Sequence, residues 1–193
     1  MKITTNLPII SFASTKEWRA WLVKNYDNSS GIWLKFAKKA SGISSVTYDE
    51  ALHVALCFGW IDGQGRKFDD KYWLVKFTQR GPKSIWSKRN CEIATKLIAD
   101  GKMQPAGLAK VEAAKKDGRW QAAYDSQKNM TVPEDFLKQL SKNKKAKAFF
   151  ESLNKANTYA IAWRLQTAKK PETREKRMKA ILETLAKGGK FHD

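Results

Sequence analysis

The sequence predicts an α+β protein, in which a small antiparallel sheet packed with helices is followed by a helical C-terminal half. Segments rich in β-favouring residues lie within residues 8–80, between helices that begin with capping patterns. From residue 84 onward, Gly and Pro punctuate a series of helical segments. We therefore expect two regions, an α+β domain over residues 1–125 and a helical region over residues 126–193.

The first elements follow from capping and alternation. Residues 8–12 form a short apolar run that is typical of a strand. Ser14, with Glu17 three residues later, predicts the start of a helix that continues to about residue 26. Residues 31–39 alternate apolar and mixed side chains, which indicates a half-buried strand.

A second helix and a hairpin complete the predicted sheet region. Thr47 and Glu50 form a capping-box pattern, and Gly59 ends the helix that they start. Residues 60–80 favour a hairpin whose turn contains Asp69 and Asp70. Gly63 and Gly65 share a face of its first strand, which indicates a bulge, room for a ligand or packing space for a neighbouring ring.

The remaining chain is predicted to be helical. One helix is expected from Ser84 to Gly101, and another from Pro105 to Gly118. Pro133 starts a further segment, and the last helix begins at Pro171.

Charge is the most unusual feature of the composition. The 193 residues include 37 Lys and Arg against 19 Asp and Glu, a formal net charge of +18. Such a field attracts nucleic acid, anionic lipid headgroups or acidic proteins, without specifying a fold. We see no apolar run that is long enough for a signal peptide or a bilayer span, so we expect a cytoplasmic protein.

Cysteine and histidine usage gives no sign of a metal or cofactor. Cys57 and Cys91 both lie beside apolar residues, which favours buried reduced thiols over a disulfide. His53 and His192 show no zinc-ligand spacing with them. We expect neither a metal nor a cofactor.

The segment from Phe77 to Asn90 carries cations with no acidic residue. Ser84 is a candidate N-cap, so the cations near it would oppose the helix dipole unless an anion binds there. Asp62, at the open end of the hairpin, is expected near Arg80 and would orient it or act as a base. The candidate ligand-binding residues are Asp62, Arg80, Lys83, Ser84, Trp86, Ser87 and Asn90.

The sequence contains no recognisable catalytic signature. There is no nucleophile elbow, no phosphate-cradling loop and no metal triad. His53 lies in the middle of an apolar helix and is more typical of a core or edge residue than of a base. The question of an enzyme stays open, and the sequence leans against one.

Several motifs together resemble the YdeI/OmpD-associated family, also called bacteriocin-protection proteins. They are ALCFGWIDG, KSIWSKRN, VPEDF and the terminal run from TREKR to LAKGGKFH, and the similarity extends from Trp18 to about His192. The resemblance implies a stress-tolerance role against bacteriocins and antimicrobial peptides, with suggested envelope association. It implies no established catalytic residue.

Three hypotheses remain. The first is a protein that binds an anionic small molecule at a helix N-terminus. The second is a nucleic-acid binder that uses the basic C-terminal half. The third is an interaction module for an acidic protein partner. The candidate nucleic-acid contacts are Lys142, Lys144, Lys145, Lys147, Arg174 and Arg177.

Overall fold

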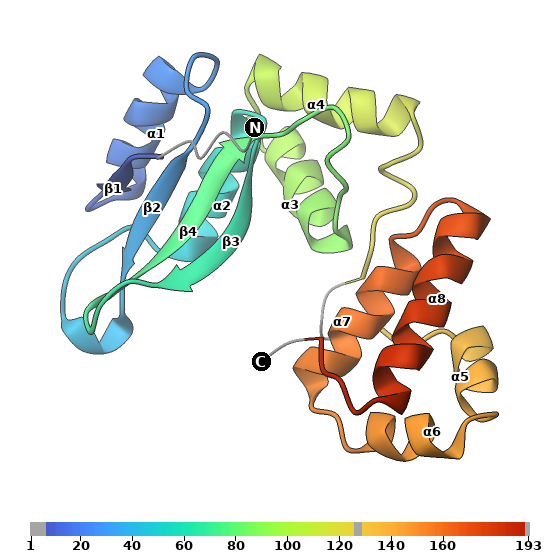
Figure 1. Ribbon diagram of the computed structural model, residues 1–193. Coiled ribbons are helices and arrows are strands. Elements are labelled where there is room, and N and C mark those ends of the chain that lie inside the picture. The colour runs from blue at the N-terminus through green and yellow to red at the C-terminus, as the bar shows by residue number, and fades with distance from the viewer. Residues whose placement is uncertain (1–6, 126–128, 192–193) are drawn as a thin grey trace, which may run out of the picture. The chain divides into compact units, whose positions relative to one another are not determined.

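The computed structural model describes residues 7–125 and 129–191, which form two compact units dividing after Ala123 (Figure 1). The first unit contains the strands and four α-helices, and the second is helical. This confirms the α+β class and the helical C-terminal half. Each unit has its own hydrophobic core, so the two are described separately.

The first unit is built on a four-stranded sheet with the order β1-β2-β4-β3. The strands are β1 (Ile9–Ser11), β2 (Ile32–Ala37), β3 (Trp60–Lys67) and β4 (Tyr72–Gln79). β2, β4 and β3 are antiparallel neighbours, whereas β1 pairs with β2 in parallel. The sheet is therefore mixed rather than wholly antiparallel, because the helix between β1 and β2 returns the chain in the same direction.

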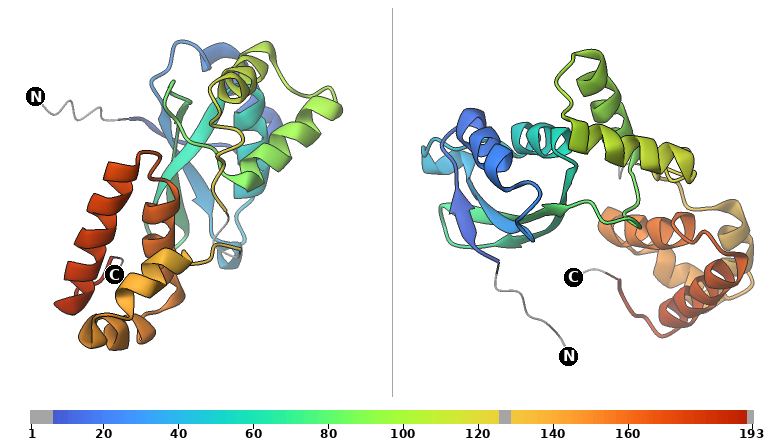
Figure 2. Two further views of the ribbon diagram at one scale, coloured as in Figure 1. Left: turned by 90° about the vertical axis from the view of Figure 1, so that its right-hand side faces the viewer. Right: turned by 90° about the horizontal axis from the view of Figure 1, so that it is seen from above.

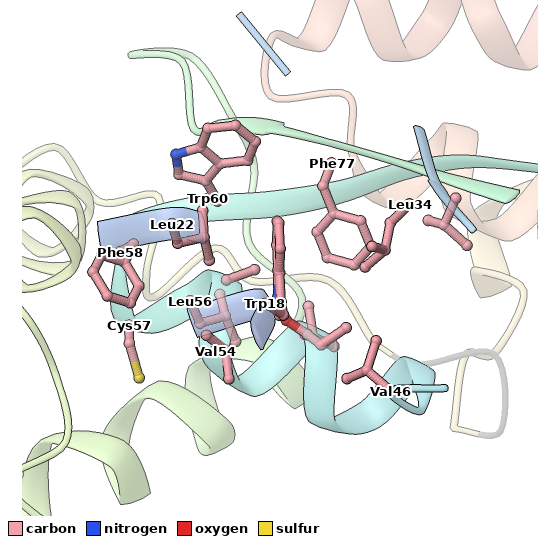
Figure 3. Close-up of a cluster of buried hydrophobic side chains, with 14 of the residues drawn as sticks. Trp18, Leu22, Leu34, Val46, Val54, Leu56, Cys57, Phe58, Trp60 and Phe77 are labelled. Atoms are coloured by element: carbon pink, nitrogen blue, oxygen red, sulfur yellow. The ribbon is translucent and has the colours of Figure 1, made fainter. Parts of the chain in front are cut away.

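Helices cover one face of this sheet. They are α1 (Thr15–Asn25) and α2 (Tyr48–Cys57), which the right-hand view of Figure 2 shows along one side of the strands. Leu34 and Phe77 point from the strands toward the helices, where Trp18 and Leu56 meet them (Figure 3). Strand alternation turns every second side chain of β2 to this core and leaves the others on the opposite face.

Local capping explains where α1 and α2 begin. The Ser14 hydroxyl accepts the Glu17 N–H, while the Glu17 carboxylate accepts the N–H of Ala13. Thr47 and Glu50 form the complete reciprocal capping box that the sequence predicts. Gly59 follows α2 with φ +73°, a left-handed conformation that glycine adopts without strain.

The β3–β4 hairpin has the predicted aspartate turn. The Asp69 carboxylate accepts the N–H groups of Lys71 and Tyr72, both at 2.8 Å. The register shifts between Asp62 and Gly65, so the glycine pair marks a bulge in β3.

Two further helices complete the unit, α3 (Lys88–Ala99) and α4 (Pro105–Lys116). The N-cap of α3 lies three residues later than predicted, because Ser87 rather than Ser84 caps the helix and accepts the Asn90 N–H at 3.1 Å. Residues 81–87 form a loop whose carbonyl groups are bound by arginine side chains, as described below. The predicted start of α4 at Pro105 is confirmed.

The second unit contains α5 (Glu134–Leu140), a short α6 (Lys144–Glu151), α7 (Lys155–Gln166) and α8 (Pro171–Ala186). The predicted starts near Pro133 and at Pro171 are confirmed. Its core is apolar, and the fully or nearly fully buried members are Phe136, Leu140, Ala146, Ile161, Leu165, Ile181 and Leu185.

Candidate functional site

The loop between β4 and α3 is held by a buried arginine. Arg80 directly follows β4 and is only 2% exposed. Its Nη1 donates to the Ile85 carbonyl at 3.1 Å, and its guanidinium lies over the Trp86 ring, 3.6 Å from the ring centre. Trp86 is equally buried and packs against Trp120 at 4.9 Å. Arg80 therefore fixes the shape of the loop from inside the unit.

A second arginine holds the same loop from the end of α4. Arg119 Nη1 donates to the Ser84 carbonyl at 2.9 Å, and its Nε contacts the Asp117 carboxylate at 2.7 Å. Arg119 is 9% exposed, so its guanidinium is largely removed from water. Adjacent carbonyls of the loop, those of Ser84 and Ile85, thus each accept a hydrogen bond from a buried guanidinium.

The candidate ligand residues of this segment divide into buried and exposed groups. Trp86, Ser87 and Asn90 are buried together with Arg80, and Ser84 is half-buried. Lys83 is exposed, as are Lys88 and Arg89 in the first turn of α3, a turn that contains no acidic residue. The buried members are therefore removed from solvent, whereas these three cations lie at the surface.

Asp62 contacts a different partner from the one expected. Its Oδ2 accepts a hydrogen bond from the Tyr48 hydroxyl at 2.7 Å. In the hairpin Asp62 pairs with Phe77, while Gln79 pairs with Trp60. Arg80 instead points toward the loop that follows β4. The sequence could not identify Tyr48 as the partner, because α2 and β3 meet only in the folded chain.

The environment of Tyr48 changes its acidity. Burial, followed by the hydrogen bond to Asp62, raises the pKa of Tyr48 well above its ordinary value. Nearby, Arg89 pairs with Asp49 at 2.7 Å, and this hydrogen bond raises the pKa of Arg89. The Arg89–Asp49 pair is largely solvent-exposed, so it contributes little to stability.

A cavity of about 430 Å³ lies on the side of α1 and α2 that faces α3. It was not anticipated from the sequence, because its walls come from separate helices. His53 Nδ1 lies 2.6 Å from the Asp49 carbonyl, and Cys57, one helical turn later, is buried. Burial raises the pKa of the Cys57 thiol, so it stays protonated at neutral pH. The lining residues are Thr15, Arg19, Asp49, Glu50, His53, Val54, Cys57, Leu97 and Lys102.

Both cysteines are free thiols, as the sequence predicts. Cys91 is half-buried, and burial raises its pKa to about 11. Within residues 7–125 and 129–191, no group of three or more His, Cys, Asp or Glu side chains is placed to hold a metal ion.

The basic residues predicted in the second unit also divide into two groups. The four lysines, Lys142, Lys144, Lys145 and Lys147, are exposed around the start of α6. Arg174 forms a bidentate ion pair with the Asp135 carboxylate of α5. Arg177 donates to the Arg164 carbonyl at 2.8 Å. These two arginines connect α8 to its neighbours, whereas the four lysines are exposed, and Lys147 pairs with Glu151 one turn later in α6.

The fold and these surfaces define a basic α+β protein with a separate helical unit. In the described part of the chain, no helix has the length and apolar character needed to cross a membrane. Residues 10–110, just over half of the chain, match a family model described as a domain of unknown function (DUF8412), and the chain belongs to this family.

Residues 129–188 match a second model, described as "Bacteriocin-protection, YdeI or OmpD-Associated". The resemblance to that family is therefore confirmed, but over the C-terminal unit rather than nearly the whole chain. This match indicates a bacteriocin-protection-like function in general terms. Searches of curated proteins and of solved structures found no match.

Proposed function

We propose that this protein acts in bacteriocin or antimicrobial-peptide tolerance by binding an anionic small ligand at the exposed cations that begin α3. A net charge of +18 repels cationic peptides, so trapping such a peptide directly is disfavoured. Binding an anion, such as a phosphate- or carboxylate-bearing metabolite, is compatible with that charge.

The observation that carries this proposal is the first turn of α3. Lys88 and Arg89 occupy it, Lys83 lies in the loop before it, and no acidic residue is present in the turn. Cations at a helix start oppose the dipole by roughly 0.3–1 kcal/mol each at low salt, and a bound anion removes that cost. Arg80 and Arg119 hold the preceding loop, so the cations extend from a fixed backbone.

The residues proposed to contact the anion differ from the set of ligand-binding residues expected from the sequence. Lys83, Lys88 and Arg89 would contact the anion, and Arg89 also pairs with Asp49. Trp86, Ser87 and Asn90 would position the loop and the helix start without touching the ligand.

A second candidate is nucleic-acid binding through the lysines around α6. It is favoured by the exposure of all four lysines and by a first turn of α6 that also lacks an acidic residue. One experiment separates the two candidates. Amide chemical shifts of the labelled full chain are followed during titration with inorganic phosphate and with a short oligonucleotide.

The first proposal expects phosphate to shift the amides of residues 83–89, and the variant K83Q/K88Q to weaken this binding about tenfold or more. The control K16Q/K24Q removes the same charge from α1 and is expected to bind as the parent does. Phosphate shifts that are absent, or equally reduced by the control, would overturn the proposal. Oligonucleotide shifts centred on residues 142–147 would support the second candidate.

A further inference from the structure

The face of the sheet opposite α1 and α2 combines aromatic and basic side chains. Alternation along β2 places Trp33 and Lys35 on this face, since Leu34 points into the core. Lys76 of β4 pairs with Trp33, and Arg66 of β3 lies across Leu74 from Lys35. Three cations from three neighbouring strands therefore share one surface. Figure 1 shows these strands side by side.

Apolar and aromatic groups surround these cations. Ile9 of β1 pairs with Trp33 and is 44% exposed, and Phe68 beyond the end of β3 is 46% exposed. Tyr72 lies four positions from Lys76 along β4, about 13 Å away at ordinary strand rise. The strand residues that alternation places on this face include no Asp or Glu. Positive charge on this surface is thus not neutralised by a neighbouring strand carboxylate.

Two of the three cations, Arg66 and Lys35, are stacked on aromatic rings. The Arg66 guanidinium carbon lies 4.0 Å above the centre of the Trp33 ring. Lys35 Nζ lies 3.8 Å from the Tyr72 ring and 5.0 Å from the Phe68 ring. Arg66 is exposed, so the outer face of its planar guanidinium is presented to solvent over an indole. A flat platform of this kind is held in place before any ligand arrives.

We infer that this sheet face binds single-stranded nucleic acid. Unpaired bases stack on aromatic rings and on arginine planes, and the lysines neutralise the phosphates between them. Stacking tolerates any base because each has a π-face, so binding is expected without strong sequence preference. A double helix keeps its bases inside and would offer this surface only phosphates. The inference is independent of the anion site proposed at α3.

The charge and the rings together favour this ligand over other anionic partners. An acidic protein or an anionic membrane would be attracted by Lys35, Arg66 and Lys76, but a membrane supplies no planar rings for the Arg66–Trp33 pair. A protein supplies them only at individual aromatic side chains, whereas every nucleotide carries a base that can stack. Both alternatives are outcomes of the test below.

The test measures binding of the full chain to a fluorescent oligo(dT) of about 15 nucleotides as a function of salt. The variant R66Q/K76Q should bind at least tenfold more weakly, because the Arg66 stacking plane and the Lys76 phosphate contact are both lost. The slope of log affinity against log salt should fall by about 0.7, which corresponds to one phosphate contact on a single strand. Trp33→Ala should also lose about tenfold, while Trp33→Phe retains a ring and most of the affinity.

Matched controls make the result specific to this face. K16Q/K24Q on α1 removes equal charge from the opposite side, and K83Q/K88Q alters the α3 site; both should leave oligo(dT) binding unchanged. Equal loss in either control, or equal affinity of R66Q/K76Q and the parent, would overturn the inference. So would a duplex of the same length that binds as tightly as the single strand.

Two additional readouts keep the outcome clear. If Trp33→Ala unfolds, R66Q/K76Q decides the matter, because Arg66 is a surface residue whose replacement opens no core cavity. Vesicles of phosphatidylglycerol and an acidic polypeptide are titrated in parallel. Loss of binding to either, with oligo(dT) binding intact in the same variant, would assign the face to that partner and refute the inference.

Discussion

Single residues in this chain take their roles from partners that are distant in sequence. Tyr48 begins α2 and Asp62 lies in β3, yet the Tyr48 hydroxyl donates to the Asp62 carboxylate at 2.7 Å. Burial of the ring, with the adjacent carboxylate, disfavours the phenolate and raises the pKa of Tyr48. The sequence suggests Arg80 as the partner of Asp62, whereas the folded chain supplies the Tyr48 hydroxyl.

Tyr48 is expected to couple stability to alkaline pH. Because the folded chain holds the phenol proton more tightly than the unfolded chain, its contribution is complete below about pH 10 and is lost as pH rises further. Tyr48→Phe should cost about 1 kcal/mol at pH 7, from the lost hydrogen bond. It should also make the stability curve flatter above pH 10.

Urea unfolding at a series of pH values measures both effects. Asp62→Asn removes the carboxylate but leaves Tyr48 buried. The stability that this variant loses above pH 10 should therefore lie between the losses of the parent and of Tyr48→Phe. If the unfolding free energy of Tyr48→Phe fell as steeply above pH 10 as that of the parent, this account would be contradicted.

At the scale of elements, close backbone contacts decide how the helices pack. α4 approaches the end of α2 at Gly107, where an added Cβ would collide with the backbone oxygens of Leu56 and Cys57. Gly101, which ends α3 with φ +64°, has open space around it. The two glycines are thus required for different reasons, packing at Gly107 and backbone conformation at Gly101.

Alanine substitutions separate these two requirements. Alanine in a helix interior is normally better than glycine by about 1 kcal/mol. Gly107→Ala should nevertheless destabilise the protein by about 2 kcal/mol or more, because the colliding atoms are backbone and α4 must move. Gly101→Ala should cost only about 1–2 kcal/mol, from its left-handed conformation. The urea midpoints of the two variants show which substitution destabilises the protein more. If Gly107→Ala left the midpoint unchanged, α4 would be able to shift without a loss of stability.

At the scale of the whole molecule, the chain contains two hydrophobic cores. The first joins β-strands to helices α1 to α4, and the buried members of the second lie on helices α5 to α8. The boundary of the compact units falls after Ala123. Each unit matches a different family model, one over residues 10–110 and the other over residues 129–188.

We expect the two units to unfold as separate cooperative transitions. Leu34→Ala opens a cavity in the first core and Ile161→Ala in the second, and each should cost about 2–5 kcal/mol. Each variant should lower the unfolding free energy of its own unit only. Hydrogen exchange of amides in β4 measures the first unit, and exchange of amides in α7 measures the second. Equal destabilisation of both units by either variant would show that they unfold together.

Local signals predicted much of the secondary structure. Thr47 and Glu50 determine the start of α2 through contacts within one turn, and the alternation around Leu34 determines which face of β2 is buried. The start of α3 was predicted wrongly, since Ser84 and Ser87 are equivalent N-caps in sequence. Arg80 and Arg119 decide between them by binding the carbonyls of the intervening loop.

The candidate site was harder to predict than the fold. The sequence identified a concentration of cations without acidic neighbours, but it grouped buried and exposed residues together. It also contained no sign that Arg66 would stack on Trp33, because these residues lie on strands that are joined only through β4.

The sequence by itself determined the charge, the caps of α1 and α2, the aspartate turn and the burial pattern of β2, because these depend on residues within a few positions of one another. Only the tertiary structure decided which cations became buried and hydrogen-bonded to loop carbonyls, and which remained at the surface. That decision depends on long-range contacts, since a guanidinium is removed from water only where distant segments supply carbonyl and aromatic partners.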